Sequence, residues 1–311
     1  MAALRTGVIG VGYMGRFHAQ KLASCRGAKL VAVVDRDRAR ACQVASEVGC
    51  APRADYRRLL DEIEAAVVAV PTELHYEVVR DCLEAGVNVL VEKPLARSVP
   101  EADELLARAR KKRLVLQVGH LERFNPAFRA LAAQRAQPLF IDIERLAPFK
   151  ARGTDVDVVL DLMIHDLDLV LALESAPVEQ LSACGFSVLT EAIDIANARI
   201  EFASGCVASV SASRVSQSPV RKLRVIRKHG YVSADLQGQR LRTVRKSGAG
   251  IRESERSFER TDALRLQAEA FVRAVRSRRP PAVGGDEGRR ALQLALQVRE
   301  LVQARLARYA A

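Results

Sequence analysis

The chain has 311 residues, of which 49% are hydrophobic and 28% are charged, and its formal net charge is +12. The composition is that of a globular protein, the length favours two domains, and no apolar run reaches the roughly 18 residues of a membrane span. The basic residues are scattered with few aromatic residues among them, so the sequence predicts an anionic small-molecule substrate rather than a nucleic-acid partner.

The first 120 residues alternate apolar strands with helices. Strands are expected at residues 5–12, 29–35, 65–70, 88–93 and 113–119, and helices at 13–23, 38–48, 74–85 and 99–111. Because nearly continuous apolar strands are typical of a sheet covered on both faces, this pattern predicts an α/β domain over residues 1–120 with a doubly wound parallel sheet. The first residues lead directly into a strand and show no secretory signal, so we expect a cytoplasmic protein.

After residue 120 the strands become longer and alternate between apolar and polar residues. Strands are expected at 138–146, 178–188, 194–202, 206–214, 222–228 and 230–236, and helices at 126–134, 157–173, 262–277 and 286–308. Alternation predicts an exposed face, and therefore a second α+β domain over residues 121–311 with an open, mainly antiparallel sheet. Few helices remain to cover both faces, so we expect the sheet to bury one face in a homodimer or homotetramer.

A glycine-rich turn, with Gly10, Gly12 and Gly15 in the pattern G-x-G-x-x-G, lies between the first strand and the first helix. Such a turn brings the amides of a helix N-terminus close to a pyrophosphate. The next strand ends at Asp35, where an acid would bind the ribose 2′-hydroxyl of NAD; an ordinary glycine turn with an incidental aspartate is the alternative. A carboxylate repels the 2′-phosphate of NADP, so we expect NAD to be preferred, and Arg36 and Arg38 to weaken that preference.

Two later strands end in residues suited to ligand binding. One leads into Pro71 and Thr72, and the next leads into Lys93, which is followed by Pro94. A proline ends strand pairing because it has no N–H, and ligands bind beyond the carboxyl ends of the strands in open α/β sheets. We therefore expect Lys93 to face the cofactor, with a solvated lysine at a strand tip as the alternative.

The predicted helix 157–173 is apolar except for a narrow polar stripe. At about 100° per residue, Asp157, Asp161, His165 and Asp168 fall within about 80° of one another, whereas Asp166 lies on the opposite side. A core helix with such a stripe is typical of a cleft wall, and a carboxylate beside an imidazole orients a general base. A histidine that is merely hydrogen-bonded in the core is the alternative.

The sequence offers no sign of a metal or of disulfide bonds. Its six cysteines form no C-x-x-C pair and lie in apolar or helical stretches, which is typical of reduced and mostly buried thiols. No group of histidines and cysteines has zinc spacing, so we expect no metal.

Five motifs follow one another along the chain: G-x-G-x-x-G-x-x-H at 10–18, PTELH at 71–75, EKP at 92–94, RFNP at 123–126 and D-x-x-x-H at 161–165. Together they resemble the Gfo/Idh/MocA family of NAD(P)-dependent oxidoreductases over nearly the whole chain. The resemblance implies an N-terminal Rossmann domain and a C-terminal α/β domain whose open sheet often mediates oligomers.

By that resemblance Lys93 is a catalytic residue, and Asp161 and His165 bind and deprotonate a sugar or polyol hydroxyl. The expected cofactor site comprises Gly10, Gly12, Tyr13, Met14, Gly15, Asp35, Arg36, Pro71, Thr72, His75, Glu92 and Lys93. The expected substrate site comprises Arg123, Asn125, Asp161, His165 and Arg214. The catalytic positions are all intact, which argues against the non-catalytic members of the family.

Within the family, residues 119–128 and 161–173 are similar to those of the branch that oxidises the 3-hydroxyl of UDP-N-acetylglucosamine, a step toward diamino-sugar lipid A. This similarity implies a UDP-sugar as the anionic substrate. Three alternatives stay open: a dehydrogenase of a free polyol such as inositol, a keto-sugar reductase, and an NAD-sensing regulator without turnover.

Overall fold

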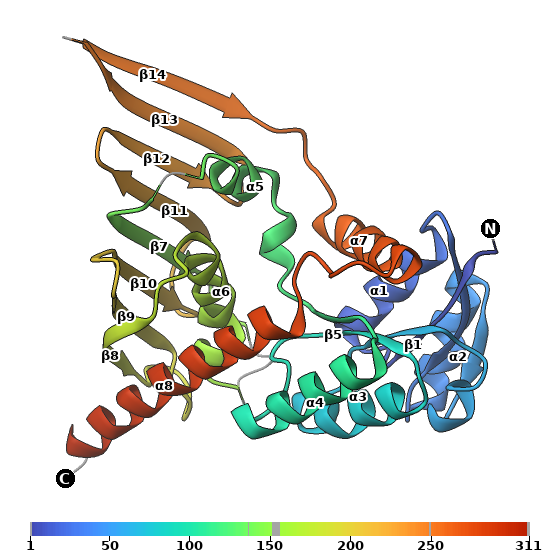
Figure 1. The fold of residues 1–311 in the computed structure, drawn as a ribbon. Helices are drawn as coiled ribbons and strands as arrows, with labels where there is room; N and C mark the ends of the chain where they lie inside the picture. Colours follow the sequence, from blue (N-terminus) through green and yellow to red (C-terminus); the bar gives the residue numbers. More distant parts are fainter. Residues whose placement is uncertain (1, 136, 151–155, 249, 310–311) are drawn as a thin grey trace. The chain divides into compact units, whose positions relative to one another are not determined.

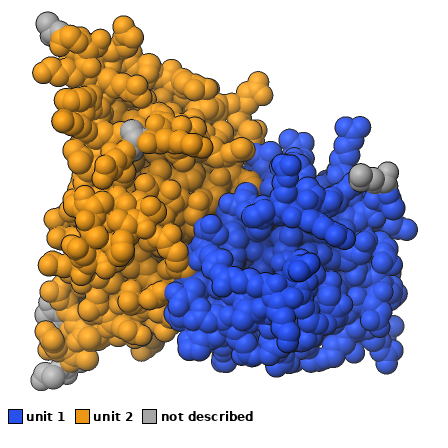
Figure 2. Space-filling model, in the orientation of Figure 1, with its two compact units in different colours: residues 1–121, 262–289 blue, residues 122–261, 290–311 orange. Residues whose placement is uncertain are grey.

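The computed structural model describes residues 2–135, 137–150, 156–248 and 250–309, and the chain forms two compact units (Figure 2). The first unit comprises Met1–Leu121 and Asp262–Arg289, and the second comprises Glu122–Thr261 and Arg290–Ala311. The sequence-based division placed everything after residue 120 in the second domain. Residues 262–289 belong instead to the first unit, because Ala268, Phe271 and Val272 are buried in its hydrophobic core.

The first unit contains a six-stranded parallel sheet in the order β3-β2-β1-β4-β5-β6. Its strands are β1 (Leu4–Ile9), β2 (Ala28–Val34), β3 (Ala51–Arg53), β4 (Ala65–Val68), β5 (Asn88–Val91) and β6 (Leu116–Val118). Its helices are α1 (Tyr13–Ala23), α2 (Arg38–Val48), α3 (His75–Glu84), α4 (Val99–Lys112) and α7 (Ala263–Ser277), with short 3₁₀ turns at Arg57–Leu59 and Thr72–Leu74. A further 3₁₀ turn, Leu121–Phe124, begins at the last residue of the segment Met1–Leu121 and continues into the second unit. This strand order is that of a dinucleotide-binding sheet, and it places a crevice at the carboxyl ends of β1 and β4, where the order reverses.

The second unit contains an eight-stranded sheet in the order β14-β13-β12-β11-β7-β10-β9-β8. Its strands are β7 (Phe140–Leu146), β8 (Val178–Phe186), β9 (Ile195–Phe202), β10 (Val207–Ser213), β11 (Val220–Arg227), β12 (Gly230–Asp235), β13 (Arg240–Ser247) and β14 (Gly250–Ser257). Only the β7–β10 pairing in this sheet is parallel, so the predicted open, mainly antiparallel sheet is confirmed.

Helices cover one face of this second sheet (Figure 1). They are α5 (Pro126–Ala132), a π-helical turn (Val159–Met163) that continues into α6 (Ile164–Leu173), and the part of α8 (Gly285–Tyr309) that follows Arg289. In β9 the side chains of Ala198, Ile200 and Phe202 point into the core beneath these helices and are at most 1% exposed. None of the helices in the described parts of the chain is long and apolar enough to cross a membrane.

Candidate active site

The turn between β1 and α1 needs glycine at two positions for different reasons. Gly10 has φ +84°, and a Cβ there would lie 2.7 Å from the carbonyl oxygen of Ala69. A Cβ at Gly15 would lie 1.8 Å from the carbonyl oxygen of Gly10, because helix and strand approach very closely. A Cβ at Gly12 would meet no protein atom within 4 Å, so this position faces open space. Packing within the protein therefore explains the glycines at positions 10 and 15, but it does not explain the glycine at position 12.

These features fit a dinucleotide. Gly12 is the N-cap of α1 and supplies no capping side chain, and the N-terminus of a helix binds phosphate groups through its backbone amides. The ring of Tyr13 is 62% exposed beside them and packs edge-on against Phe17, with 5.3 Å between ring centroids. Backbone donors and exposed aromatic surface of this kind suit a pyrophosphate with an attached nucleoside.

Asp35 is held in place at the end of β2. Its carboxylate accepts hydrogen bonds of 2.9 Å from the backbone amides of Val11 and Asp37, which ties the second strand to the glycine-rich turn. The guanidinium beside it belongs to Arg40, whose Nη1 lies 3.5 Å from Asp35 Oδ2, and not to the exposed Arg36 that we named from the sequence. Arg40 also lines a surface pocket with Gly12 and is a residue that the sequence analysis missed.

Lys93 leaves the sheet after β5, and a buried hydrogen bond between two side chains lies next to it. Oε1 of Glu92 is 2.7 Å from Nε2 of His18 on α1, and Oε2 of Glu92 accepts from the Lys93 amide at 3.3 Å. Burial raises the pKa of Glu92, but the hydrogen bond from His18 and the charges of His18 and Lys93 outweigh it, so the pKa lies below the usual value. Glu92, predicted to bind the cofactor, is thus engaged within the protein. The histidine ending the motif at 10–18 is its partner, and sequence analysis gave it no role.

His75 connects the ends of two strands. Its Nδ1 lies 2.7 Å from the carbonyl oxygen of Pro94, and its Nε2 lies 3.0 Å from the carbonyl oxygen of Val70. The ring is 1% exposed, and burial keeps its pKa below the usual value. His75 therefore holds the chain after Lys93 against the end of β4. By contrast, Pro71 is exposed and Thr72 is half-buried at the carboxyl edge of the sheet.

In the second unit, Asp161 lies on the π-helical turn and His165 lies on the first turn of α6, and both side chains are half-buried. A π-helical turn is rare and is frequently found at functional sites. Asp157, another member of the predicted stripe, accepts hydrogen bonds of 2.9 Å from the amides of Val159 and Leu160 and so caps this turn.

The remaining acids of the helix are used in ion pairs within the second unit. Asp168 accepts two hydrogen bonds from Arg123, at 2.7 and 3.0 Å. Asp166, on the opposite side, accepts two from the buried Arg145, at 2.9 and 2.8 Å. Asp157, Asp161 and His165 are the half-buried members of the predicted polar stripe, and Asp168 is buried in its ion pair. Arg145 interrupts an apolar strand face and was not singled out from the sequence.

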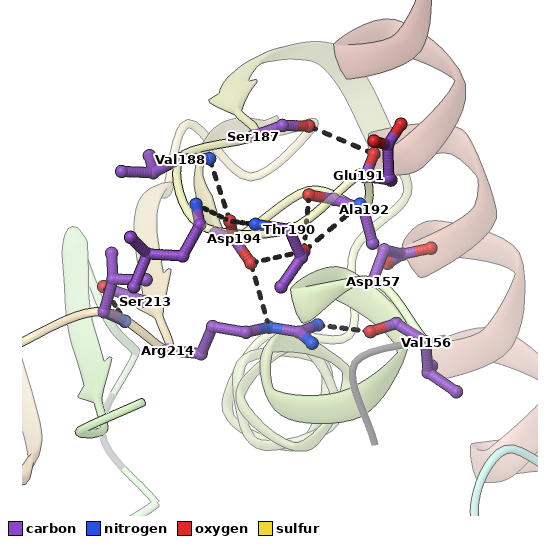
Figure 3. A network of polar contacts seen from close by, with 12 residues as sticks. Val156, Asp157, Ser187, Val188, Thr190, Glu191, Ala192, Asp194, Ser213 and Arg214 are labelled. Atoms are coloured by element: carbon purple, nitrogen blue, oxygen red, sulfur yellow. Dashed lines mark hydrogen bonds and ion pairs between the residues drawn. The ribbon is translucent and has the colours of Figure 1, made fainter. Parts of the chain in front are cut away.

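The three other predicted substrate residues also have partners within the second unit. Arg123 pairs with Asp168, and Asn125 caps α5 by accepting from the Ala127 amide at 3.0 Å while donating to the carbonyl of Leu236 at 2.7 Å. Arg214 is 7% exposed and lies in a network with Asp194 (Figure 3). Each has a structural role, and a role in substrate binding stays a prediction.

The described residues contain no group of three or more histidine, cysteine, aspartate or glutamate side chains that would hold a metal ion. The six cysteines are free thiols, and burial raises the pKa of Cys82 to about 12.

A parallel sheet in the order 3-2-1-4-5-6, a glycine-rich turn fitted to a dinucleotide and a lysine at the carboxyl edge define an NAD-binding oxidoreductase. Residues 4–120 match the family described as "Oxidoreductase family, NAD-binding Rossmann fold", and residues 133–233 match the "GFO/IDH/MocA C-terminal domain". The chain belongs to the Gfo/Idh/MocA family of oxidoreductases.

Among its relatives is UDP-N-acetylglucosamine 3-dehydrogenase of Acidithiobacillus ferrooxidans, which is 39% identical over 99% of this chain and 100% of the relative. A crystal structure of that enzyme superposes with a TM-score of 0.93 over 98% of this chain and 99% of the other. Scyllo-inositol 2-dehydrogenase (NAD(+)) of Bacillus subtilis is 32% identical over 68% of each chain.

Proposed function

We propose that this protein oxidises the 3-hydroxyl of UDP-N-acetylglucosamine to a ketone, with NAD as the oxidant. The observation that carries the proposal is the similarity to UDP-N-acetylglucosamine 3-dehydrogenase, which extends over 99% of this chain and all of the relative. A net charge of +12 suits a substrate that carries a diphosphate. The ketone would then be a substrate for an aminotransferase that supplies a diamino sugar to lipid A.

We assign the chemistry to the three predicted catalytic residues. Bound NAD would supply the acceptor for the hydride that leaves the sugar carbon. His165 would accept the hydroxyl proton, because an imidazole has its ordinary pKa near neutrality. Lys93 would donate a hydrogen bond to the reacting oxygen and stabilise its growing negative charge. Asp161, one turn before His165, would bind a sugar hydroxyl and orient the imidazole.

Oxidation of a free polyol is the second candidate, and the B. subtilis scyllo-inositol dehydrogenase supports it. The higher identity to UDP-N-acetylglucosamine 3-dehydrogenase, 39% against 32%, favours the nucleotide sugar. A panel of UDP-sugars and inositols, assayed by NADH absorbance, discriminates the two. NADH formed with inositols and not with UDP-sugars would replace the first proposal with the second. A regulator without turnover would bind NAD and produce no NADH with any compound of this panel.

The catalytic roles predict a large loss of turnover when either group is removed. Lys93→Ala and His165→Ala should each lower kcat by about 10²–10⁴-fold, the usual cost of losing a positioned acid–base group. NAD affinity, measured by quenching of intrinsic fluorescence, should change little in His165→Ala.

Lys111→Ala and His229→Ala serve as matched controls, since both side chains are exposed at the ends of elements. These two variants should retain wild-type turnover. A Lys93→Ala enzyme with near-normal kcat would instead make Lys93 a solvated residue at a strand tip.

A further inference from the structure

A fully buried carboxylate organises one end of the second sheet (Figure 3). Asp194, at the start of β9, is 0% exposed, and its Oδ2 accepts from the amides of Val188, Leu189 and Thr190 at 2.8, 2.7 and 2.9 Å. Its Oδ1 accepts from the Thr190 hydroxyl at 2.8 Å. One carboxylate therefore fixes the whole connection between β8 and β9.

Arg214, at the end of β10, joins this carboxylate to a second segment of the chain. Its Nε lies 3.7 Å from Asp194 Oδ1, and its backbone amide donates to the Asp194 carbonyl at 3.0 Å. Its Nη2 donates to the carbonyl of Val156 (Figure 3). A planar guanidinium holds both partners in a fixed geometry, which a lysine would not do.

Val156 lies three residues before the start of the π-helical turn that carries Asp161. The Val158 amide donates to the Ile193 carbonyl at 2.9 Å, next to Asp194, and the Asp161 amide donates to the Asp157 carbonyl at 3.0 Å. The contacts of Asp194 and Arg214 thus converge on the residues that start the helix.

Apolar burial alone does not determine where this helix starts or how it is rotated about its axis. Ile164 and Leu167 in α6 are fully buried, but apolar contacts are non-directional and tolerate small rotations and shifts of a helix. Directional hydrogen bonds at the first turn select one rotation of the helix about its axis. Burial raises the pKa of Asp194, but the three backbone amides and the Thr190 hydroxyl outweigh it and keep the pKa below its usual value. Asp194 is therefore charged at neutral pH and can pair with Arg214.

We propose that Asp194 and Arg214 are positioning residues, which fix the rotation of the helix that carries Asp161 and His165 and so align both side chains with the sugar. This inference rests on the proposed function. It assigns Arg214 a role that acts through other residues rather than through contact with the substrate.

The test compares Asp194→Asn, Arg214→Lys and Arg214→Ala with the wild type. Misplacing a reacting group by about 1 Å costs about 10²-fold. We therefore expect kcat with UDP-N-acetylglucosamine to fall by about 10–100-fold in Asp194→Asn and Arg214→Ala, with less loss in Arg214→Lys. Added guanidinium should partly restore the kcat of Arg214→Ala. NAD affinity should stay at the wild-type value, because the cofactor residues belong to the first unit.

Glu174→Gln is the matched control. Glu174 is also a buried carboxylate of the second unit and accepts from the Ala176 amide and the Ser204 hydroxyl, both at 2.8 Å, but it follows the other end of α6. Its loss should lower the melting temperature without a comparable loss of kcat. If Asp194→Asn does not fold, Thr190→Val serves in its place, because it removes one hydrogen bond to the carboxylate and should lower kcat a few-fold.

Two outcomes would overturn the inference. One is a folded Arg214→Ala or Asp194→Asn enzyme with wild-type kcat and KM. The other is an equal loss of kcat in Glu174→Gln, which would show that the contacts of Asp194 and Arg214 contribute only to the stability of the fold. Failure of the proposed function would give a different result: the wild-type protein itself would neither bind nor oxidise UDP-N-acetylglucosamine.

Discussion

The carboxylate of Asp35 is the residue on which cofactor choice depends. Two backbone amides hold it rigidly at the end of β2, and Arg40 lies beside it. A fixed negative charge repels the 2′-phosphate of NADP, whereas a guanidinium attracts it. Asp35 therefore favours NAD, whereas Arg40 favours NADP.

Removal of Asp35 should shift that balance. We expect Asp35→Ala to lower the ratio of kcat/KM for NAD to that for NADP by about 10-fold or more, because a charged hydrogen bond contributes about 1.5–3 kcal/mol. Adding Arg40→Ala to this variant should abolish the gain with NADP, whereas adding Arg36→Ala should not. Steady-state kinetics with both cofactors measure the ratios. Better use of NADP than NAD by the wild type would contradict the assignment.

The His18–Glu92 pair leads to a prediction about pH and stability. Because the folded-state pKa of Glu92 lies below its usual value of about 4.3, its ionised form stabilises the fold above that pH. The contribution is lost as the pH falls through the folded-state pKa. Glu92→Gln should cost about 1.5–3 kcal/mol near pH 7, and the difference from the wild type should shrink below about pH 4. Urea unfolding at both pH values tests this, and a constant difference would show that the charge of Glu92 contributes nothing.

At this scale the sequence predicted where the strands end better than it predicted which side chains are in contact. Lys93 and Asp35 follow strands in the predicted way, because the end of a strand is visible in the apolar pattern. The partners of Glu92, Arg123 and Asn125 were not predictable, since each lies on another element and depends on tertiary packing. A sequence motif identifies a set of residues, but it does not show which of their side chains are in contact.

The elements themselves followed from hydrophobic pattern where that pattern was strong. The helices predicted at 13–23 and 38–48 have these bounds in the structure. The helix predicted at 157–173 begins instead with a π-helical turn at Val159–Met163, which no residue pattern announces. The strands β13 and β14 were missed, because their sequences are dominated by charged residues and all of β14 is exposed. Backbone pairing with β13, rather than apolar burial, forms β14, whereas β13 also buries Leu241 in the core.

The β1–α1 turn allows fold and function to be separated by two single substitutions. Gly12→Ala meets no protein atom within 4 Å, so the melting temperature should not fall, whereas the dissociation constant for NAD should rise by about 10-fold or more as a cofactor contact is lost. Gly15→Ala meets the Gly10 carbonyl at 1.8 Å and should destabilise the fold by more than about 1–3 kcal/mol. Thermal unfolding and fluorescence titration measure the two effects. Tight NAD binding by Gly12→Ala would show that the space at this glycine is not the cofactor's.

At the scale of the whole molecule, the uncovered face of the second sheet carries apolar side chains. Phe186 and Ile195 form a cross-strand pair on that face and are 46% and 37% exposed, and Ile226 is 43% exposed. An apolar surface of this kind on a sheet is typical of a subunit interface.

We therefore expect a homodimer or a larger homo-oligomer at micromolar concentration. Ile195→Glu combined with Ile226→Glu should dissociate it, because two buried charges without partners would destabilise the interface. Leu301→Glu on α8, where the side chain is 39% exposed, is the control and should leave the assembly intact. Light scattering coupled to size exclusion measures the mass. A wild-type monomer under these conditions would refute the prediction.

The placement of α7 in the first unit has a consequence for how the chain is made. Residues 1–121 emerge from the ribosome early. The hydrophobic core that they form is complete only after Ala268, Phe271 and Val272 have been synthesised. Residues 122–261 are synthesised in between, which takes on the order of ten seconds at about 5–20 residues per second. During that interval the nascent dinucleotide-binding unit exposes the apolar surface that α7 later covers. Chaperone binding to nascent chains should therefore be strongest in this window and should end when α7 emerges.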